Sequence, residues 1–289
     1  MHVICFAWPL GYTFAARGRP AESTDYNCMT KIVLITGASD GIGLEIARQS
    51  VALGYAVFML ARDPDRLRKA AETVPGDLRP RFVSVDLTDE RQRYAFLIGM
   101  DEAELVPDIL VNNAGIGLAG SFADAPWEKL EALFKLNMIA TSHLNHWAVN
   151  RMIKRGSGAF VNMSSAVATR PSPWFAAYAA SKAFINSLSQ ALYMEARDHG
   201  VSVSVIHPPE VRSTANINRQ KADLSNTLAL KLLPSISEFA VAKAVLKAAH
   251  SGRRSISPGI VTWAAMATAG KLPQWLDLKL MSILFKPLK

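Results

Sequence analysis

The sequence predicts an α/β fold, in which a doubly wound parallel β-sheet forms a single domain. Short apolar runs alternate with longer helical patterns along the chain, and this alternation is typical of βαβ units. No Pro/Ser-rich linker and no internal repeat divides the body of the chain. Of its 289 residues 50% are hydrophobic and 19% are charged, so the chain can bury one large core and is not of the disordered or low-complexity class.

Six strands are predicted, with a short seventh after them. In chain order they are 31–36 (KIVLIT), 56–61 (AVFMLA), 81–86 (RFVSVD), 108–112 (DILVN), 158–164 (GAFVNMS), 201–207 (VSVSVIH) and a short run near 255–258. Helical patterns fill 42–53, 64–74, 89–100, 126–154, 174–199 and 236–250. In such sheets ligands bind beyond the carboxyl ends of the strands, so polar residues at those ends are the candidates for a site.

The N-terminal segment differs from the rest of the chain. We expect residues 29–289 to form the domain, and residues 1–28 to be either a disordered extension or a stretch after an upstream start codon that is not used. Both cysteines, Cys5 and Cys28, lie in the extension, which excludes disulfides, thiolate metal sites and a cysteine nucleophile from the domain. The first 16 residues have no Lys or Arg before their apolar part, which argues against a signal peptide and favours a cytoplasmic location.

A glycine-rich turn follows the first predicted strand and opens a helix. Its sequence is Thr36-Gly37-Ala38-Ser39-Asp40-Gly41-Ile42-Gly43. Small residues let the backbone turn sharply and approach a pyrophosphate, which then sits at the positive N-terminus of the helix. Taken alone, the segment could equally be an ordinary strand–helix turn.

Three further residues suggest proton-transfer chemistry. Tyr178 and Lys182 are four residues apart and share one face of a helix. A nearby ammonium group favours the phenolate of a tyrosine, whose reference pKa is about 10. Ser165, at the end of the fifth predicted strand, could donate to a carbonyl oxygen that Tyr178 protonates. Each residue alone has a plainer interpretation, a surface pair for Tyr178 and Lys182 and a helix cap for Ser165.

Together these motifs are highly specific. The sequence resembles the short-chain dehydrogenase/reductase family, in its short single-domain branch, over about residues 30–260. The resemblance rests on TGASDGIG (36–43), Asp86, NNAG (112–115), Asn137, Ser165 and YAASK (178–182). It implies a Rossmann-like fold and an NAD(P)-dependent oxidoreductase that interconverts alcohols and carbonyls.

The resemblance also implies roles for individual residues. The catalytic set would be Asn137, Ser165, Tyr178 and Lys182. Tyr178 would be the general acid in reduction and the base in oxidation, and Ser165 would orient the carbonyl or alcohol. Lys182 would hold the nicotinamide ribose and tune Tyr178, while Asn137 would support a proton-relay water.

A larger set would bind the cofactor. It comprises Gly37, Ser39, Asp40, Gly41, Ile42, Gly43, Arg62, Asp86, Leu87, Asn113, Ala114, Gly115, Tyr178, Lys182, Pro208, Val211 and Ser213. One segment departs from the family pattern, because PGxVxT after the sixth strand is replaced here by Pro208-Pro209-Glu210-Val211-Arg212-Ser213. Pro209 lacks the flexibility of glycine and a backbone N–H. We expect cofactor binding to survive this change.

The end of the second predicted strand predicts a preference for NADP(H) over NAD(H). Enzymes that select NAD usually place a carboxylate there, which binds the adenosine 2′-hydroxyl and repels a 2′-phosphate. Here the position is Ala61, and the following Arg62 can bind the phosphate through two hydrogen bonds. The alternative is that Arg62 is a surface residue paired with Asp63 or Asp65.

The substrate is expected to be a small, hydrophobic ketone, aldehyde or secondary alcohol. Ser165, Val167, Trp174 and Tyr178 are the predicted substrate contacts, although Trp174 could equally be part of the core. Residues 214–235 resemble the substrate loop of the family. The resemblance further implies a homodimer or homotetramer through the helices at 126–154 and 174–199.

Positive charge is concentrated at the C-terminal end. The net charge is +8, and residues 240–289 hold eight basic residues and one acid, hence +7. No basic stripe with groove-reading elements accompanies it, so a nucleic-acid partner is not expected. Residues 271–289 are predicted to be a basic amphipathic segment, which could lie on an anionic membrane surface. The sequence favours the alternative, that it covers the substrate cleft or packs on a second subunit.

Other function classes are disfavoured. His143 and His146 could share a helix face, but no carboxylate accompanies them, so no metal site is expected. No run reaches the roughly 18 uncharged residues of a membrane span. The length of the chain and the spacing of its glycines argue against a dehydratase or epimerase of the family's longer branch. The main alternative is a non-catalytic nucleotide-binding regulator or scaffold, since a fold does not guarantee activity.

Overall fold

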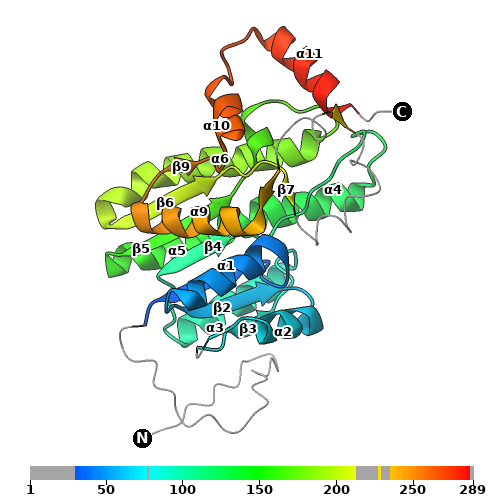
Figure 1. Ribbon diagram of the computed structural model, residues 1–289. Coiled ribbons are helices and arrows are strands. Elements are labelled where there is room, and N and C mark those ends of the chain that lie inside the picture. The colour runs from blue at the N-terminus through cyan, green and yellow to red at the C-terminus, as the bar shows by residue number, and fades with distance from the viewer. Residues whose placement is uncertain (1–29, 77, 213–226, 229–234, 287–289) are drawn as a thin grey trace, which may run out of the picture.

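A seven-stranded, wholly parallel sheet forms the centre of the protein, in the order β3-β2-β1-β4-β5-β6-β9 (Figure 1). The computed structural model describes residues 30–76, 78–212, 227–228 and 235–286. The strands are β1 (Ile32–Thr36), β2 (Ala56–Ala61), β3 (Arg81–Ser84), β4 (Ile109–Asn112), β5 (Gly158–Met163), β6 (Val201–Ile206) and β9 (Ser255–Ile256). This confirms the predicted fold class.

Helices cover both faces of the sheet, and each face has its own apolar core. The helices are α1 (Gly41–Ala52), α2 (Pro64–Glu72), α3 (Glu90–Glu102), α4 (Trp127–Phe134), α5 (Thr141–Arg155), α6 (Ala176–Ala196) and α9 (Glu238–Ser251). One core lies under α1, α2 and α9 and includes Ile46, Leu67 and Val245. The other lies under α3, α5 and α6 and includes Phe96 and Leu144.

The strand order reverses between β1 and β4, which are neighbours in the sheet. Such a switch point opens a crevice at the carboxyl ends of the strands, because the helices after the two strands leave on opposite faces. Here β1 is followed by α1 on one face, and β4 leads to α4 and α5, of which α5 covers the other. The predicted glycine turn and the NNAG segment therefore meet at this crevice.

The predicted helix at 126–154 consists of three consecutive segments. A π-helical segment, Lys135–Ala140, joins α4 to α5. Such a segment holds one more residue in a helical turn than an α-helix does, and it often occurs at functional sites. The sequence pattern did not predict it, because helical periodicity does not distinguish one inserted residue.

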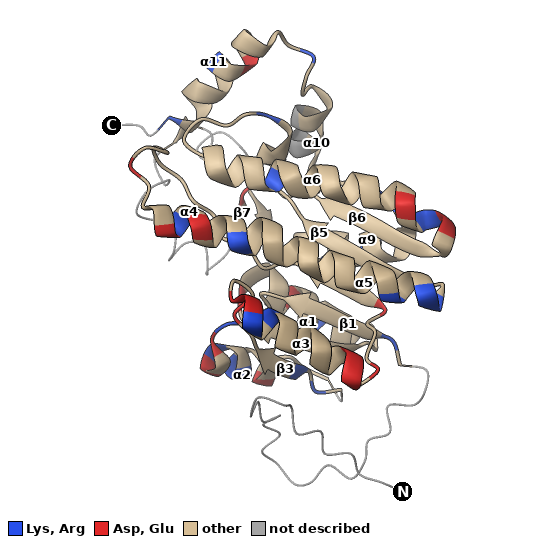
Figure 2. Ribbon diagram, turned by 180° about the vertical axis from the view of Figure 1, so that it is seen from behind, with Lys and Arg blue, Asp and Glu red and all other residues tan. Residues whose placement is uncertain are grey.

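The structure adds elements beyond the predicted ones. Two short strands, β7 (Val211–Arg212) and β8 (Ile236–Ser237), pair in parallel outside the main sheet. Two further helices, α10 (Ile260–Ala267) and α11 (Gln274–Phe285), lie together at one end of the molecule, beyond α6 and opposite the end that carries α2 and β3 (Figures 1 and 2). None of the described helices is both long and apolar enough to cross a bilayer.

Candidate active site

The glycine turn after β1 has a backbone that only glycine adopts readily. Gly37 and Gly41 have φ values of +67° and +56°. A Cβ atom on Gly43 would lie 2.2 Å from the carbonyl oxygen of Gly37 and 2.7 Å from Nδ2 of Asn113. Asp40 caps α1 by accepting a hydrogen bond from the N–H of Gly41 (2.8 Å). The first turn of α1 therefore packs directly against the glycine turn, with its N-terminus at the crevice.

The NNAG segment after β4 is fixed to the same turn. Asn113 donates through Nδ2 to the carbonyl oxygens of Thr36 (3.0 Å) and Gly37 (3.2 Å). The N–H groups of Asn113 and Ala114 both donate to Oγ1 of Thr36. Asn112 is buried instead and donates to Asn145 and Asn162 in the core. The predicted nucleotide-binding residues of β1 and β4 thus form one hydrogen-bonded surface.

The side chain of Arg62, after β2, is exposed and forms no ion pair with any residue that the structure describes. Asp63 caps α2 through the N–H of Arg66, and Asp65 pairs with Arg68. Asp40 pairs with Arg66 at 2.8 Å, which neutralises the carboxylate nearest the glycine turn. The alternative pairing of Arg62 with Asp63 or Asp65 is therefore not found.

The end of β3 lies next to Arg62, because the hydroxyl of Ser84 donates to the carbonyl oxygen of Arg62. Asp86 follows this strand, and its Oδ1 accepts from the N–H (2.9 Å) and the hydroxyl (2.7 Å) of Thr88. Leu87 is buried in the core, and its carbonyl oxygen accepts from Arg93. Asp86 is thus held at the crevice, whereas the Leu87 side chain points away from it.

Asn137 lies in the π-helical segment and is almost fully buried. Its Oδ1 accepts from the N–H of Ile116 (2.8 Å), and its Nδ2 donates to the carbonyl oxygen of Ile116 and to Oγ of Ser181 (3.0 Å each). A Cβ atom on Gly115 would lie 3.2 Å from Oδ1 of Asn137 and 3.3 Å from Nζ of Lys182. Asn137 therefore connects the loop after β4 to α6, and the lack of a side chain at Gly115 lets Asn137 and Lys182 approach its backbone closely.

Tyr178 and Lys182 lie on the first turns of α6, next to the end of β5. The ammonium group of Lys182 donates to the carbonyl oxygen of Met163 (2.8 Å) and lies 5.8 Å from the ring centroid of Tyr178. Oγ of Ser164 donates to the carbonyl oxygen of Lys182. The end of β5 thus fixes the lysine, and through it the position of the tyrosine.

Burial shifts the acidity of both groups. It lowers the pKa of Lys182 to about 8. Burial of the phenol also raises the pKa of Tyr178, a hydrogen bond with Ser165 opposes the rise, and the charge of Glu210 adds to it. The ammonium group is therefore still mostly charged at pH 7, and the tyrosine is a phenol in the nucleotide-free protein.

Ser165 begins a short 3₁₀ turn, Ala166–Thr169, and its Oγ accepts a long hydrogen bond from the N–H of Val167 (3.5 Å). The N–H of Ala166 donates to the carbonyl oxygen of Pro208 (3.0 Å), which joins this turn to the segment after β6. Val211 of that segment is buried in the core, and Ser213 lies outside the described residues. The end of β6 is therefore held next to Ser165.

Sequence reasoning missed Glu210 as a site residue. Loss of contact with water raises the pKa of the Glu210 carboxyl group. Its charge raises the pKa of Tyr178, although 32 residues separate the two in sequence. The only signal was its place within the segment that departs from the family pattern. Propensity and spacing do not reveal that this segment faces α6.

The predicted substrate residues lie under α11. Val167, Trp174 and Phe175 pack against the buried Met281 and Phe285 of that helix. The Phe175 and Phe285 rings meet edge to face, with centroids 5.2 Å apart. Arg170 and Asp277 form an ion pair of 2.6 Å between the 3₁₀ turn and α11. The described part of the C-terminal segment thus covers these residues.

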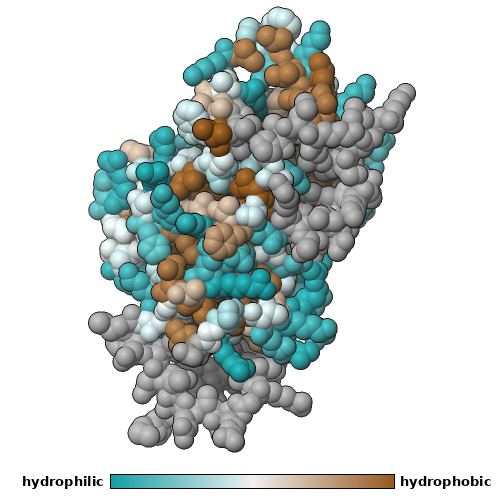
Figure 3. Space-filling view, in the orientation of Figure 1, coloured by the Kyte–Doolittle hydropathy of each residue, from teal (hydrophilic) through white to brown (hydrophobic). Residues whose placement is uncertain are grey.

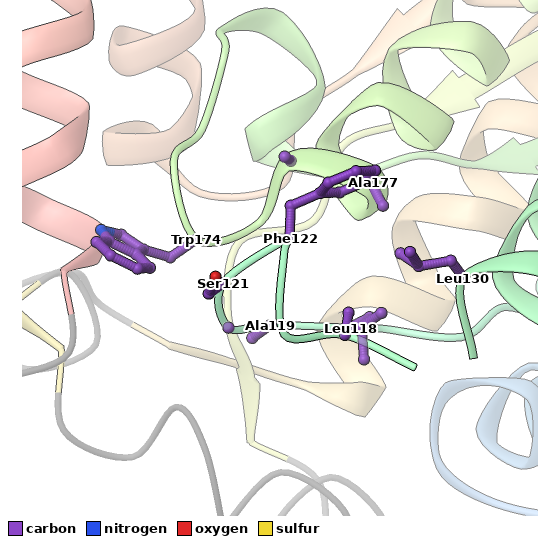
Figure 4. A pocket seen from close by; sticks show the side chains of 10 residues that line it. Leu118, Ala119, Ser121, Phe122, Leu130, Trp174 and Ala177 are labelled. Carbon is purple, nitrogen blue, oxygen red and sulfur yellow. The ribbon is translucent and has the colours of Figure 1, made fainter. Parts of the chain in front are cut away.

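Trp174 has an unusual backbone and an unsatisfied donor. Its φ is +69°, and its carbonyl oxygen accepts from the N–H of Gly120 (2.8 Å). Its Nε1 is buried without a hydrogen-bond partner among the described residues. A small apolar pocket lies beside it, lined by Leu118, Ala119, Gly120, Ser121, Phe122, Ala125, Leu130, Trp174, Ala176 and Ala177 (Figure 4). Figure 4 shows the indole pointing away from Leu118 and Leu130. Trp174 therefore forms one edge of the pocket.

The predicted N-terminal extension and the predicted substrate loop are only partly within reach of the structure. Residues 1–28 lie outside the described residues, as does most of the predicted substrate loop at 214–235. Within the part of the chain that is described, no group of three or more His, Cys, Asp or Glu side chains could hold a metal ion.

The profile of the short chain dehydrogenase family matches residues 31–224. An oxidoreductase of Escherichia coli named YbbO is 32% identical over 201 residues, which cover 68% of this chain and 72% of that protein. A short chain dehydrogenase of Pseudocercospora fijiensis is 35% identical over 190 residues. That match covers 63% of this chain and 60% of the relative's length.

Two other matches have names or titles that mention a phosphorylated nicotinamide cofactor. A structure described as a short-chain dehydrogenase from Sphingobium yanoikuyae in complex with NADPH superimposes with a TM-score of 0.73 and 29% identity, covering 83% of this chain and 93% of that one. An NADP-dependent (R)-specific alcohol dehydrogenase of Lentilactobacillus kefiri is 31% identical over 186 residues, which cover 63% of this chain and 74% of that protein.

Proposed function

Because the chain belongs to the short-chain dehydrogenase/reductase family, we propose that it interconverts a carbonyl and an alcohol on a small, hydrophobic substrate, with NADP(H) as its cofactor. The convergence of Ser165, Tyr178 and Lys182 beside the nucleotide crevice is the observation that carries this proposal. A hydroxyl and a phenol that share a hydrogen bond, with an ammonium group beside the phenol, are a proton-transfer set, and none of them is arranged as a nucleophile.

The residues at the crevice fit a dinucleotide. The glycine turn, from Gly37 to Gly43, would hold the diphosphate at the N-terminus of α1, because the first N–H groups of a helix have no partner within the helix and its dipole favours an anion there. Asp86 and the Asn113–Gly115 segment would bind the adenosine. Gly115 lets the ammonium group of Lys182 lie close to the backbone of the crevice, which a Cβ atom would prevent, and there Lys182 would bind the nicotinamide ribose.

When bound, the nicotinamide supplies or accepts a hydride. In reduction, Tyr178 donates the proton of its phenol to the carbonyl oxygen, and in oxidation the phenolate takes it back. Ser165 donates to the same oxygen and so holds it within reach of Tyr178. The charged Lys182 lowers the cost of forming the phenolate, which opposes the effect of burial. Asn137 fixes the loop after β4 against α6 and supports a relay water.

The preference for NADP(H) rests on Arg62. Its guanidinium is exposed and unpaired among the described residues, beside a turn whose own carboxylate, Asp40, is already neutralised by Arg66. Ala38 in that turn donates to the carbonyl oxygen of Leu60, so the end of β2 and the turn are neighbours. A 2′-phosphate in this place would meet a cation and no free carboxylate.

The substrate class rests on the apolar surroundings of Ser165 and Tyr178. Val167, Trp174 and Phe175 form an apolar cluster with Met281 and Phe285 of α11, and most residues that line the small pocket beside Trp174 are apolar. The buried Nε1 of Trp174 offers one hydrogen bond to a polar group of the substrate. Such a site favours an uncharged ketone, aldehyde or secondary alcohol.

A screen of ketones and alcohols, followed by nicotinamide absorbance, tests the reaction, and Tyr178→Phe tests the mechanism. The phenylalanine keeps the ring and removes the proton donor. We expect kcat to fall by at least about 100-fold, which is the scale of general acid–base catalysis. Tyr193→Phe, which removes the same hydroxyl further along α6 in the core under that helix, is the control. Near-normal turnover in Tyr178→Phe would contradict the mechanism, and nucleotide binding without any turnover would favour a regulator.

Assembly and location complete the proposal. We expect a homodimer or homotetramer through the helices at 126–154 and 174–199, in the cytoplasm. Sedimentation of the full chain measures the first, and imaging of a tagged chain in its cell measures the second. A monomer in sedimentation would contradict the predicted assembly.

A further inference from the structure

The end of the molecule formed by α10 and α11 exposes an unusual amount of apolar surface. Eight of the large hydrophobic side chains exposed in the described part of the chain fall within residues 260–283. They are Ile260, Trp263, Leu272, Trp275, Leu276, Leu278, Leu280 and Ile283. Figure 3 shows hydrophobic side chains gathered along α11 at this end. We call these residues, together with the lysines among them, the apical surface.

The helix α11 is apolar on both its faces. Asp277, Met281 and Phe285 recur every fourth residue and form the inner face, which packs over the 3₁₀ turn. On the outer side Trp275 is 67% exposed and Ile283 is 54% exposed. Large apolar side chains on both sides of a helix are normally buried or in contact with lipid. The inner face already has its partner within the chain, so the outer face is the part that needs another.

The charge on this surface has one sign. Lys271, Lys279 and Lys286 are exposed and form no ion pair with a described residue. Asp277 is the only acid between residues 255 and 289, and it is paired with Arg170 on the inner side. The apical surface therefore combines apolar side chains with uncompensated positive charge.

We propose that the apical surface docks the protein on an anionic phospholipid bilayer. Tryptophan and aliphatic side chains enter the headgroup boundary, while lysines extend their charged ends to the lipid phosphates. The 12 residues of α11 extend over roughly 18 Å, which is too short for the roughly 30 Å hydrocarbon core, so the helix lies in the interface.

A second copy of the chain fits the same surface less well. In a symmetric dimer the same patch meets itself, so the exposed lysines of the two copies come close together. The one acid near this surface, Asp277, is buried on the inner face of α11 and already paired, so it offers no compensation. An anionic bilayer matches both the apolar area and the charge.

Flotation of the full-length protein with vesicles tests this docking, and it needs neither nucleotide nor turnover. The vesicles are phosphatidylcholine alone and phosphatidylcholine mixed with phosphatidylglycerol. We expect the protein to float with the mixed vesicles and much less with the neutral ones. Trp275→Glu should reduce the bound fraction at least about tenfold, because it places a charge where an apolar side chain enters the interface. Lys279→Gln should reduce partitioning about fivefold, which corresponds to ~1 kcal/mol for each basic residue near an anionic surface.

Phe239→Glu is the matched control, since Phe239 is 58% exposed but lies on α9, away from the apical surface and from the helices of the proposed assembly. It should float like the unsubstituted protein. Melting temperatures of all variants check that they fold, and Lys279→Gln decides the matter if Trp275→Glu does not. Three results would overturn the docking: no flotation of the unsubstituted protein, flotation of both apical variants at its level, or an equal loss in Phe239→Glu. Sedimentation without lipid then shows whether a second copy covers the surface instead.

Discussion

The nucleotide side and the substrate side of the site are built in different ways. On the nucleotide side, backbone atoms of β1, α1 and β4 lie in direct contact, and Thr36 and Asn113 join them with hydrogen bonds. On the substrate side, α11 lies more than 100 residues further along the sequence than the turn it covers, and the Arg170–Asp277 ion pair and a small apolar cluster hold it there. The nucleotide side tolerates almost no added volume, whereas the substrate side depends on side chains that other residues could replace. Chains of this fold can therefore change substrate while the nucleotide site stays fixed.

The largest effect is expected from Gly43→Val on the nucleotide side. A Cβ atom there would lie 2.2 Å from a backbone oxygen, so α1 has to move away from the turn. We expect NADPH affinity to fall more than about 100-fold, since such overpacking costs up to 3 kcal/mol or more. Titration of NADPH by fluorescence measures it. Gly54→Ala is the control, because it strains a positive φ in open space and should leave the affinity unchanged. Equal affinities in both variants would show that the close packing is not required.

Arg62→Ala tests the nucleotide side more specifically, because it should weaken the binding of NADPH and not that of NADH. We expect NADPH binding to weaken by about 1.5–3 kcal/mol, the value of a hydrogen bond to a charged group, and NADH binding to change little. Arg68→Ala is the control, since Arg68 is an exposed arginine that pairs with Asp65 on α2. Titrations of both cofactors against the three proteins measure the difference. Equal losses for NADPH and NADH would mean that Arg62 does not bind the 2′-phosphate.

The two sides also differ in how far they could be predicted from the sequence. The glycine turn, Tyr178 and Lys182 were predictable because each function needs a fixed residue type at a short spacing, and such spacing is visible in the chain. The Arg170–Asp277 pair was not, because it joins residues 107 apart and depends on how α11 packs. The π-helical segment at Asn137 was not predicted either, because its extra residue does not alter the helical pattern of the sequence.

Asp277→Asn should affect the substrate side alone. The ion pair with Arg170 is largely shielded from solvent, and removing the carboxylate leaves a partly buried cation, which loosens α11 over Val167 and Trp174. We expect the KM for the substrate to rise several-fold, with the Kd for NADPH unchanged. Asp198→Asn is the control, since its pair with Arg197 is exposed. If NADPH binding falls as much as substrate binding, the two sides are not independent.

The smallest effect is expected at Glu210, which lies where the two sides meet. Its negative charge raises the pKa of Tyr178, because a nearby anion opposes formation of the phenolate. Alcohol oxidation needs the phenolate as base, so its rate rises as pH increases through this pKa. Removing the charge in Glu210→Gln lowers the pKa of Tyr178 and therefore moves the rising limb of the pH–rate profile to lower pH. We expect a shift of roughly half a pH unit to one pH unit, as for a single charge that is partly screened. Glu210→Asp keeps the charge, so its profile should stay close to that of the unsubstituted enzyme. A limb that stays in place in Glu210→Gln would mean that Glu210 does not tune the tyrosine, whatever its effect on the maximal rate.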